Sequence, residues 1–346
     1  MSRRRNIIRP AQKKLRVGFV SPGLGIGGAE RWVLSLIKYL DPTKIQISGV
    51  LSWCVTDPLS PEANKYCPLY GPWQVEEFIA NTDTIIAWGW EGLPELFTNF
   101  KGRMIGVSHA SPVQGWHCRV CAKMENFPGI ELVGVSKRSL DVWQTAHTGV
   151  YIPNGVECDR VCPRKGRSKI REELSIPPDA KVALFVGRLA PEKRPEKFAE
   201  AVLSLPDNWY GIIAGSDIQG IGRKLPVHHS LKLLPAVQSP GDLLAASDVF
   251  VLPSTSEAHP LALTEAWLAG VATVYCDWPF AQQIREDHGS DLGWVIPVDF
   301  ERKQLVEAIT TVPVLGSRFT EKARHIAWEN YTAPAMAARW EAYLGV

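Results

Sequence analysis

Residues 248–270, with the sequence DVFVLPSTSEAHPLALTEAWLAG, hold the pattern that most restricts the fold of this chain. A short apolar run at 249–252 has the length and composition of a buried parallel strand. After a loop comes a helical segment, with Pro260 suited to its first turn and Gly270 suited to its C-terminal cap. This order aims the helix N-terminus across the carboxyl end of the strand, where ligands bind in open α/β sheets. The free N–H groups and positive dipole end of such a helix suit a phosphate.

Two carboxylates frame this turn, Glu257 in the loop and Glu265 in the early helix. Such a pair could be the acid and base of a glycoside hydrolase, whose carboxylate separation cannot be read from sequence. The segment GRLAPEKR at 187–194 follows another apolar run and brings two cations, Arg188 and Lys193, to a strand end. Fixed cations there suit a diphosphate and its leaving charge. Hydrolysis has no use for them, so the four residues together favour a nucleotide-sugar site, with Glu265 toward the ribose and Glu257 toward the sugar.

Short apolar runs alternate with helical segments along the whole chain, which predicts an α/β protein with parallel sheets. The pattern restarts after a passage rich in Pro and charge at 158–180, so we expect two Rossmann-like units with a cleft between them. The expected strands are 15–20, 44–53, 84–88, 104–107, 132–135, 150–152, 182–186, 209–214, 231–234, 249–252, 273–276 and 294–298.

The loop GLGIGG at 23–28 matches the GxGxxG pattern of dinucleotide-binding enzymes. A dehydrogenase also needs an acid at the end of the second strand, to hold a ribose hydroxyl. That strand ends in LSWC at 51–54, without an acid, which argues against a dehydrogenase. The glycines still allow a phosphate or sugar to approach the backbone closely. His109 follows another predicted strand and is expected to face the same cleft.

Charge distribution and cysteine content indicate the cellular compartment and the contacts of the N-terminal residues. Seven of the 38 basic residues lie in 1–16, which have no acid, so the rest of the chain carries about −5. This arm is predicted to be a disordered tail or a weak anchor to an anionic membrane or nucleic acid. Seven cysteines at irregular spacing indicate a reduced, cytoplasmic protein, and no signal peptide or membrane span is expected. Cys118 and Cys121, preceded by His117, have a zinc-site spacing but lack a second pair.

Taken together, the motifs resemble those of glycosyltransferase family 4, retaining enzymes with the GT-B fold. Glu257 and Glu265 match its E-x7-E motif, and 187–193 resembles its diphosphate-binding G-R-L-x-x-x-K. The resemblance continues with GGAER at 27–31, IPNGV at 152–156 and AWE at 327–329, in family order from about 15 to 344.

The resemblance implies transfer of a sugar, with retention at the anomeric carbon, from a nucleotide-diphospho-sugar to an acceptor hydroxyl of a glycan, glycolipid or secondary metabolite. It implies no metal and no cofactor, because cations and a helix end would neutralise the leaving diphosphate. The implied catalytic residues are His109, Arg188, Lys193 and Glu257, and the implied substrate-binding residues are Gly27, Gly28, His259, Leu261, Glu265, Leu234 and Val237. The base-contacting segment would be the backbone of 234–237.

With this resemblance, we expect a basic arm at 1–14, an acceptor domain at 15–160, a donor domain at 161–325 and a terminal helix at 326–346 that returns to the first domain. The expected partners are the donor and a sugar, lipid-linked or small-molecule acceptor, with no nucleic acid. The arm could reach the inner face of a membrane.

Some positions depart from the family pattern. Ala258 stands where glycine is frequent, Ala272 replaces the usual proline, and Gln282 or Gln283 occupies the place of a common acid. Two alternatives on the same fold stay open, a non-catalytic sugar- or nucleotide-binding protein and a sugar-nucleotide epimerase. The base, the sugar and the acceptor cannot be read from the sequence.

Overall fold

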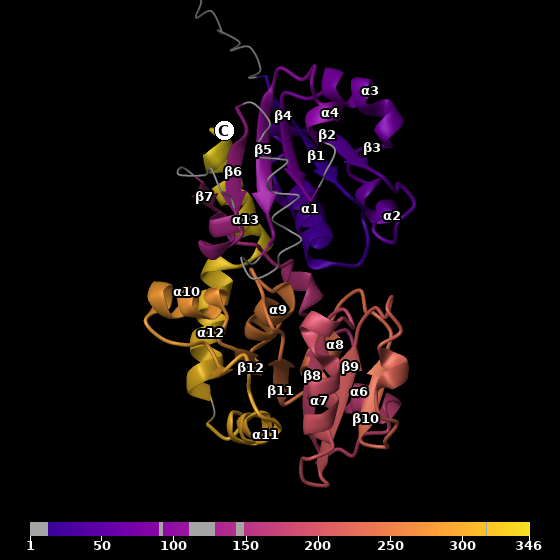
Figure 1. Ribbon diagram of the computed structural model, residues 1–346, viewed down its shortest axis with the longest axis vertical. Helices are drawn as coiled ribbons and strands as arrows, with labels where there is room; N and C mark the ends of the chain where they lie inside the picture. Colours follow the sequence, from indigo (N-terminus) through magenta and orange to yellow (C-terminus); the bar gives the residue numbers. More distant parts are fainter. Residues whose placement is uncertain (1–12, 90–92, 111–128, 143–148, 316) are drawn as a thin grey trace, which may run out of the picture.

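The computed structural model describes residues 13–89, 93–110, 129–142, 149–315 and 317–346. In these residues the chain builds two parallel sheets, one after the other, each flanked by helices (Figure 1). No helix in this part of the chain is long and apolar enough to cross a membrane.

The first sheet has the strand order β3-β2-β1-β4-β5-β6-β7, and all of its pairs are parallel. Its central strands are almost entirely buried, as expected when helices cover both faces of a parallel sheet. The strands are β1 (Leu15–Ser21), β2 (Ile45–Ser52), β3 (Leu69–Tyr70), β4 (Thr84–Trp88), β5 (Arg103–Ser108), β6 (Glu131–Gly134) and β7 (Val150–Tyr151). The helical segments are α1 (Gly28–Tyr39), α2 (Ser60–Ala63), η1 (Pro72–Gln74), α3 (Val75–Ala80), α4 (Leu93–Leu96) and η2 (Arg138–Val142).

The second sheet is also parallel, with the order β10-β9-β8-β11-β12-β13. This is the doubly wound order, in which the chain changes direction between the first and fourth strands, here β8 and β11. The strands are β8 (Lys181–Val186), β9 (Trp209–Ala214), β10 (Leu231–Leu234), β11 (Val249–Leu252), β12 (Ala272–Cys276) and β13 (Trp294–Ile296). The helical segments are η3 (Cys158–Arg160), α6 (Arg167–Glu173), η4 (Pro191–Lys193), α7 (Pro195–Val202), η5 (Gly222–Lys224), α8 (Gly241–Ala246), α9 (Leu261–Ala269), α10 (Pro279–His288), α11 (Arg302–Thr311) and α12 (Ser317–Asn330).

The chain crosses between the two halves twice, and the crossings lie side by side. Val156 N donates to Tyr331 O at 2.9 Å, and Ala333 N donates to Val156 O at 2.8 Å. After the second crossing, α13 (Ala333–Leu344) returns to the first half, where Met336 and Trp340 are fully buried beside α1. In Figure 1 this last helix lies against the first sheet, while α12 lies with the second.

The structure corrects three local expectations and adds one short strand. The helix expected near Lys137 is a short 3-10 segment, η2, and the helical region expected from 321 to 344 divides into α12 and α13 at the crossing. Pro260 is the N-cap of α9 and does not lie in its first turn. The short strand β3 was not expected, because two paired residues leave no periodic pattern to recognise.

Candidate functional site

The carboxyl ends of β8 and β11 form the centre of the candidate site. The two strands are neighbours at the point where the strand order reverses, so the loops that follow them open into one crevice. The loop after β8 carries Arg188 and Lys193, and the loop after β11 carries Glu257. Thr255 N donates to Glu192 O at 2.8 Å, which fastens the two loops to each other.

Lys193 and Glu257 form a direct ion pair. The Nζ atom of Lys193 lies 2.5 Å from Oε1 of Glu257, and their side chains are 21% and 8% exposed. A pair so little exposed interacts more strongly than one on the surface, because water screens it less. The sequence placed both residues at strand ends, and the structure brings them into contact.

Arg188 lies at the more open side of the same crevice. Its side chain is 55% exposed and pairs with Glu192 at 2.9 Å. Glu30, in the first turn of α1, interacts electrostatically with this guanidinium. Burial raises the pKa of Glu30, and the positive charge of Arg188 partly opposes that rise. Arg188 therefore acts electrostatically on a residue of the first half of the molecule.

Gly27 is the N-cap of α1 and Gly28 is its first residue. A methyl group placed on Gly28 would lie 3.8 Å from Cδ1 of Leu261, the first residue of α9. Pro260 caps α9 without a side-chain hydrogen bond, so the first-turn N–H groups have no intrahelical or side-chain cap partner. The glycine loop and the helix N-terminus thus lie on opposite walls of the crevice.

The side chain of His259 points into the junction between the two halves. Its Nδ1 lies 3.2 Å from Asn154 N and 3.2 Å from Val135 O, and its Nε2 lies 3.3 Å from Thr264 Oγ1. The ring stacks on Phe280 and is only 5% exposed. Burial lowers the pKa of His259 to about 4, and the hydrogen bond to Val135 only partly opposes this shift. The imidazole therefore holds the loop in place, and only the backbone of this residue can be considered for sugar binding.

Replacing His259 by Gln should flatten the dependence of stability on pH. The unfolded histidine binds a proton near pH 6.5, while the folded ring stays neutral until about pH 4. Stability from the neutral ring is thus complete above pH 6.5 and falls as pH drops toward 4, by about 3 kcal/mol in total. Urea unfolding of both proteins at pH 7, 6 and 5 measures this slope. His325→Gln, on the exposed face of α12, is the matched control, and an unchanged slope in His259→Gln would contradict the assignment.

Glu265 lies in the second turn of α9 and is 4% exposed. Its carboxylate pairs with Arg160, in the segment that joins the two halves, at 2.7 Å. Leu234 ends β10, and its carbonyl accepts a hydrogen bond from Gly215 N at 3.3 Å. Leu234 and Val237 are partly buried and pack against the second core.

His109 follows β5 and packs between two indole rings of the first half. Its ring centroid lies 4.7 Å from that of Trp32 and 5.6 Å from that of Trp88, both edge-on. Trp88 is itself fixed by a hydrogen bond to Ser21 Oγ at 3.0 Å. His109 is thus half-buried among aromatic rings, and its predicted contact with donor or acceptor stays a prediction.

Sequence reasoning missed three residues that shape the site: Arg160, Asn154 and Gly215. Asn154 Nδ2 donates to His259 O at 3.2 Å and so fixes the loop before α9. A methyl group on Gly215 would lie 1.7 Å from Gly187 O, so only glycine allows the turn before Arg188 to take this path. The signal for Gly215 was its place directly after a strand. Arg160 offered only its charge in a linker.

No zinc site can be assigned. His117, Cys118 and Cys121 lie outside the described residues. Cys54 and Cys67 are the two other cysteines that could complete a set of four zinc ligands. Cys54 is half-buried and Cys67 is buried, both as free thiols, and burial raises the pKa of Cys67 to about 12. Within the described ranges, no group of three or more His, Cys, Asp or Glu side chains could hold a metal ion.

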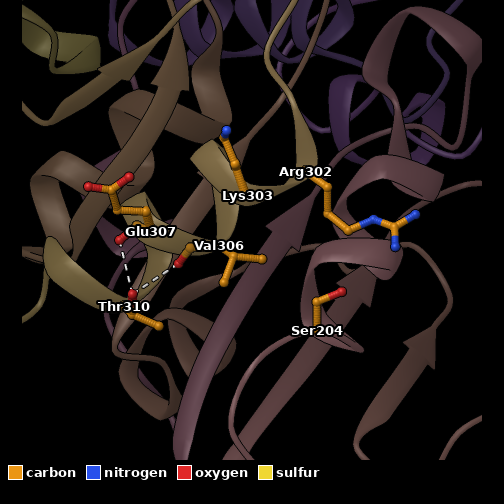
Figure 2. A pocket seen from close by; sticks show the side chains of 6 residues that line it. All are labelled: Ser204, Arg302, Lys303, Val306, Glu307 and Thr310. Carbon is orange, nitrogen blue, oxygen red and sulfur yellow. Dashed lines mark hydrogen bonds between the residues drawn. The ribbon is translucent and has the colours of Figure 1, made fainter.

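An open hollow of about 720 Å³ lies elsewhere, on α11 and the end of α7 (Figure 2). Its two cations have partners, because Arg302 pairs with Glu200 at 3.2 Å and Lys303 with Glu301 at 3.4 Å. Thr310 donates to backbone carbonyls of its own helix. Figure 1 places α11 at the end of the molecule away from the first sheet, so this hollow lies apart from the crevice.

Comparisons with known proteins agree with this geometry. Residues 166–325 match the model of the family described as "Glycosyl transferases group 1". Over 135 residues the chain is 32% identical to the UDP-Gal:alpha-D-GlcNAc-diphosphoundecaprenol alpha-1,3-galactosyltransferase of Escherichia coli, covering 36% of this chain and 35% of that protein. It is 27% identical over 216 residues to a D-inositol 3-phosphate glycosyltransferase of Streptomyces bingchenggensis (strain BCW-1), covering 55% and 47%. The chain thus spans about a third to a half of the length of these curated relatives.

The solved structures match over nearly the full length. Anabaena HepE in complex with UDP and glucose superposes with a TM-score of 0.81 at 18% identity, covering 96% of this chain and 99% of that one. WaaG, a glycosyltransferase involved in lipopolysaccharide biosynthesis, gives 0.70 at 17% identity, covering 95% and 100%. At these identities the likeness shows the fold alone.

Two facing parallel sheets with this crevice, and these structural neighbours, define the GT-B fold. The predicted fold class is therefore confirmed. The family resemblance seen in the motifs is confirmed as well, because residues 166–325 match the model of the glycosyl transferases group 1.

Proposed function

We propose that this protein is a glycosyltransferase that takes a sugar from a nucleotide-diphospho-sugar and transfers it to an acceptor hydroxyl, with retention and without a metal. The observation that carries the proposal is the Lys193–Glu257 pair at the strand-order reversal, opposite the glycine loop. The names of the relatives support a sugar nucleotide as donor, since one acts with UDP-Gal and one solved neighbour holds UDP and glucose.

Leaving-group stabilisation is the proposed role of the two cations. Cleavage of the donor places negative charge on the departing diphosphate, and fixed positive groups in a sheltered crevice lower the barrier to its formation. Lys193 is sheltered and Arg188 stands at the open side, and in this proposal the two cations would hold the diphosphate between them. The N–H groups at the start of α9 add partial positive charge. This arrangement supports a mechanism that does not depend on a metal ion.

Glu257 has two proposed tasks in sequence. Before donor arrives it serves as counter-ion of Lys193, at 2.5 Å. When the diphosphate attracts the lysine, the carboxylate becomes free to accept hydrogen bonds from the sugar hydroxyls. Glu265 would do the same for the ribose, and the backbone of 234–237 would contact the base. His109 and the first half of the molecule would serve the acceptor side.

Retention follows in this proposal from attack on the face from which the diphosphate leaves, with the acceptor proton passing to the departing phosphate through an ion-pair-like state. The acceptor class is a glycan, a glycolipid or another hydroxyl compound. The expected setting is the cytoplasm, with the basic arm as the segment that would contact an anionic membrane surface.

A donor screen tests the proposal. Thermal unfolding with UDP, GDP, ADP and dTDP sugars should show a raised melting temperature for one nucleotide, since a ligand stabilises the folded state by mass action. Release of that nucleoside diphosphate in the presence of EDTA tests metal independence, and the anomeric configuration of the product, read by NMR, tests retention. Binding without turnover would indicate a non-catalytic protein, and an isomerised donor would indicate an epimerase.

A further inference from the structure

Arg160 lies between the two parts of the predicted nucleoside site, the ribose carboxylate of Glu265 and the base segment at 234–237. It ends η3, in the segment that joins the two sheets, and its side chain is 17% exposed. Burial alone would lower the pKa of Arg160, but the Glu265 carboxylate outweighs this effect and raises it. The guanidinium is therefore a permanent, partly buried positive charge beside the carboxylate that is proposed to hold the ribose.

The bonds between Arg160 and Glu265 all end on one carboxylate oxygen. Nε of Arg160 donates to Oε1 at 2.9 Å, and Nη2 lies 2.7 Å from the same atom. Among the described residues, no hydrogen bond to Oε2 of Glu265 is found. Because Oε1 is saturated by the guanidinium, the carboxylate cannot rotate freely, and Oε2 is the atom left to accept from a ligand hydroxyl.

Arg160 also holds the segment that is predicted to contact the base. Its Nη1 donates to the carbonyl of Gln238, and its own carbonyl accepts from Ser239 Oγ at 2.5 Å. These contacts fasten the chain directly after 234–237 at two points. One residue thus fixes both the ribose carboxylate and the base segment relative to each other.

The first half of the molecule contributes a second positive charge, Arg31, that interacts electrostatically with Arg160. Arg31, in α1, is 7% exposed and pairs with Glu62 at 3.1 Å. Burial lowers the pKa of Arg31, and the positive charge of Arg160 lowers it further.

We propose that Arg160 is a positioning residue for nucleoside recognition, which orients Glu265 so that one oxygen reads the ribose hydroxyls of a nucleoside diphosphate. This inference rests on the proposed function. It assigns ribose selectivity to the Arg160–Glu265 unit, so that removal of either residue should have the same consequence for ribose recognition.

The test compares binding of UDP, GDP and ADP, each beside its 2′,3′-dideoxy counterpart, by calorimetry. Wild-type protein should prefer the ribose form of its nucleotide by about tenfold or more, the value of a charge-assisted hydrogen bond. Arg160→Ala should reduce this preference to within about twofold, and Glu265→Ala should do the same. The double variant should lose no further preference, because the two residues act as one unit.

Arg160→Lys covers the case in which Arg160→Ala does not fold. Lysine keeps the charge but loses the planar fork, so an intermediate preference is expected. Arg171→Lys is the matched control, because Arg171, on α6, is also sheltered, with its side chain 3% exposed, and pairs with a carboxylate, that of Asp248, at 3.0 Å. It should lower the melting temperature and leave the ribose preference unchanged.

Each outcome separates the inference from the proposed function. A wild-type preference that persists in both Arg160 variants would overturn the positioning role while leaving nucleotide binding intact. Loss of preference in Arg171→Lys as well would reduce the effect to general destabilisation and would also overturn it. A wild-type protein that binds none of the three nucleotides would overturn the proposed function and this inference with it.

Discussion

Lys193→Ala is expected to lower the rate of donor turnover by on the order of 10²-fold or more, because it removes a fixed cation from the position of the leaving diphosphate. It also leaves the Glu257 carboxylate, 8% exposed, without its partner. Breaking a buried pair in this way costs roughly 3–5 kcal/mol of stability. Turnover should therefore be measured well below the lowered melting temperature.

A second substitution isolates the effect on stability. Lys193→Ala combined with Glu257→Gln removes the unpaired charge, so the melting temperature should recover. The rate should stay low, because this double variant lacks both the cation and a carboxylate proposed to bind the sugar. Lys197→Ala, at an exposed position on α7, is the control for loss of a lysine from the same region. Arg188→Ala should also lower turnover by about 10²-fold, with little change in stability because its side chain is 55% exposed. A near-normal rate in Lys193→Ala or in Arg188→Ala would remove the substituted cation from the proposed mechanism.

Gly215→Ala is expected to have an effect of similar size by a steric route. The added methyl group would lie 1.7 Å from Gly187 O. Because this oxygen belongs to the backbone, it cannot turn aside as a side chain could, and the turn that carries Arg188 must move. A displacement of about 1 Å in a catalytic group can cost about 10²-fold in rate. The strain should also lower stability by about 1–3 kcal/mol.

The rate of donor turnover and the melting temperature together measure this effect. Gly166→Ala is the matched control, since a methyl group at Gly166, the N-cap of α6, would meet nothing within 4 Å. Only the small loss from a changed N-cap, about 1 kcal/mol or less, is expected there. If Gly215→Ala behaves like Gly166→Ala, the turn before Arg188 is more adaptable than its packing indicates.

Much of the architecture could be predicted from local pattern. The apolar runs at 84–88, 209–214 and 249–252 coincide with β4, β9 and β11, because a strand buried on both faces must be continuously apolar. The motifs also placed Lys193 and Glu257 on loops that follow parallel strands. Since the carboxyl ends of parallel strands share one edge of a sheet, their convergence followed from chain order alone.

Orientation and long-range pairing could not be predicted in the same way. The backbone amide of His259 was expected at the sugar, which stays a prediction, whereas the position of its ring was not foreseen: it contacts Val135, 124 positions earlier, and Asn154. Glu265 was expected to face the ribose, and its partner Arg160, 105 positions earlier, was not foreseen. No local periodicity records such contacts, because a side chain on a loop turns toward whichever partner the packing of both halves brings near.

The sequence by itself thus determined the two parallel sheets, the loops that carry the charges and the family resemblance of the second half. These depend on short-range rules of burial, helix termini and strand order, which act within one segment at a time. The tertiary structure alone decided that Lys193 meets Glu257, that His259 turns away into the junction, and that Arg160 leaves one oxygen of Glu265 open. Each of these depends on which polar groups from distant segments lie within hydrogen-bond distance once the two halves are packed together.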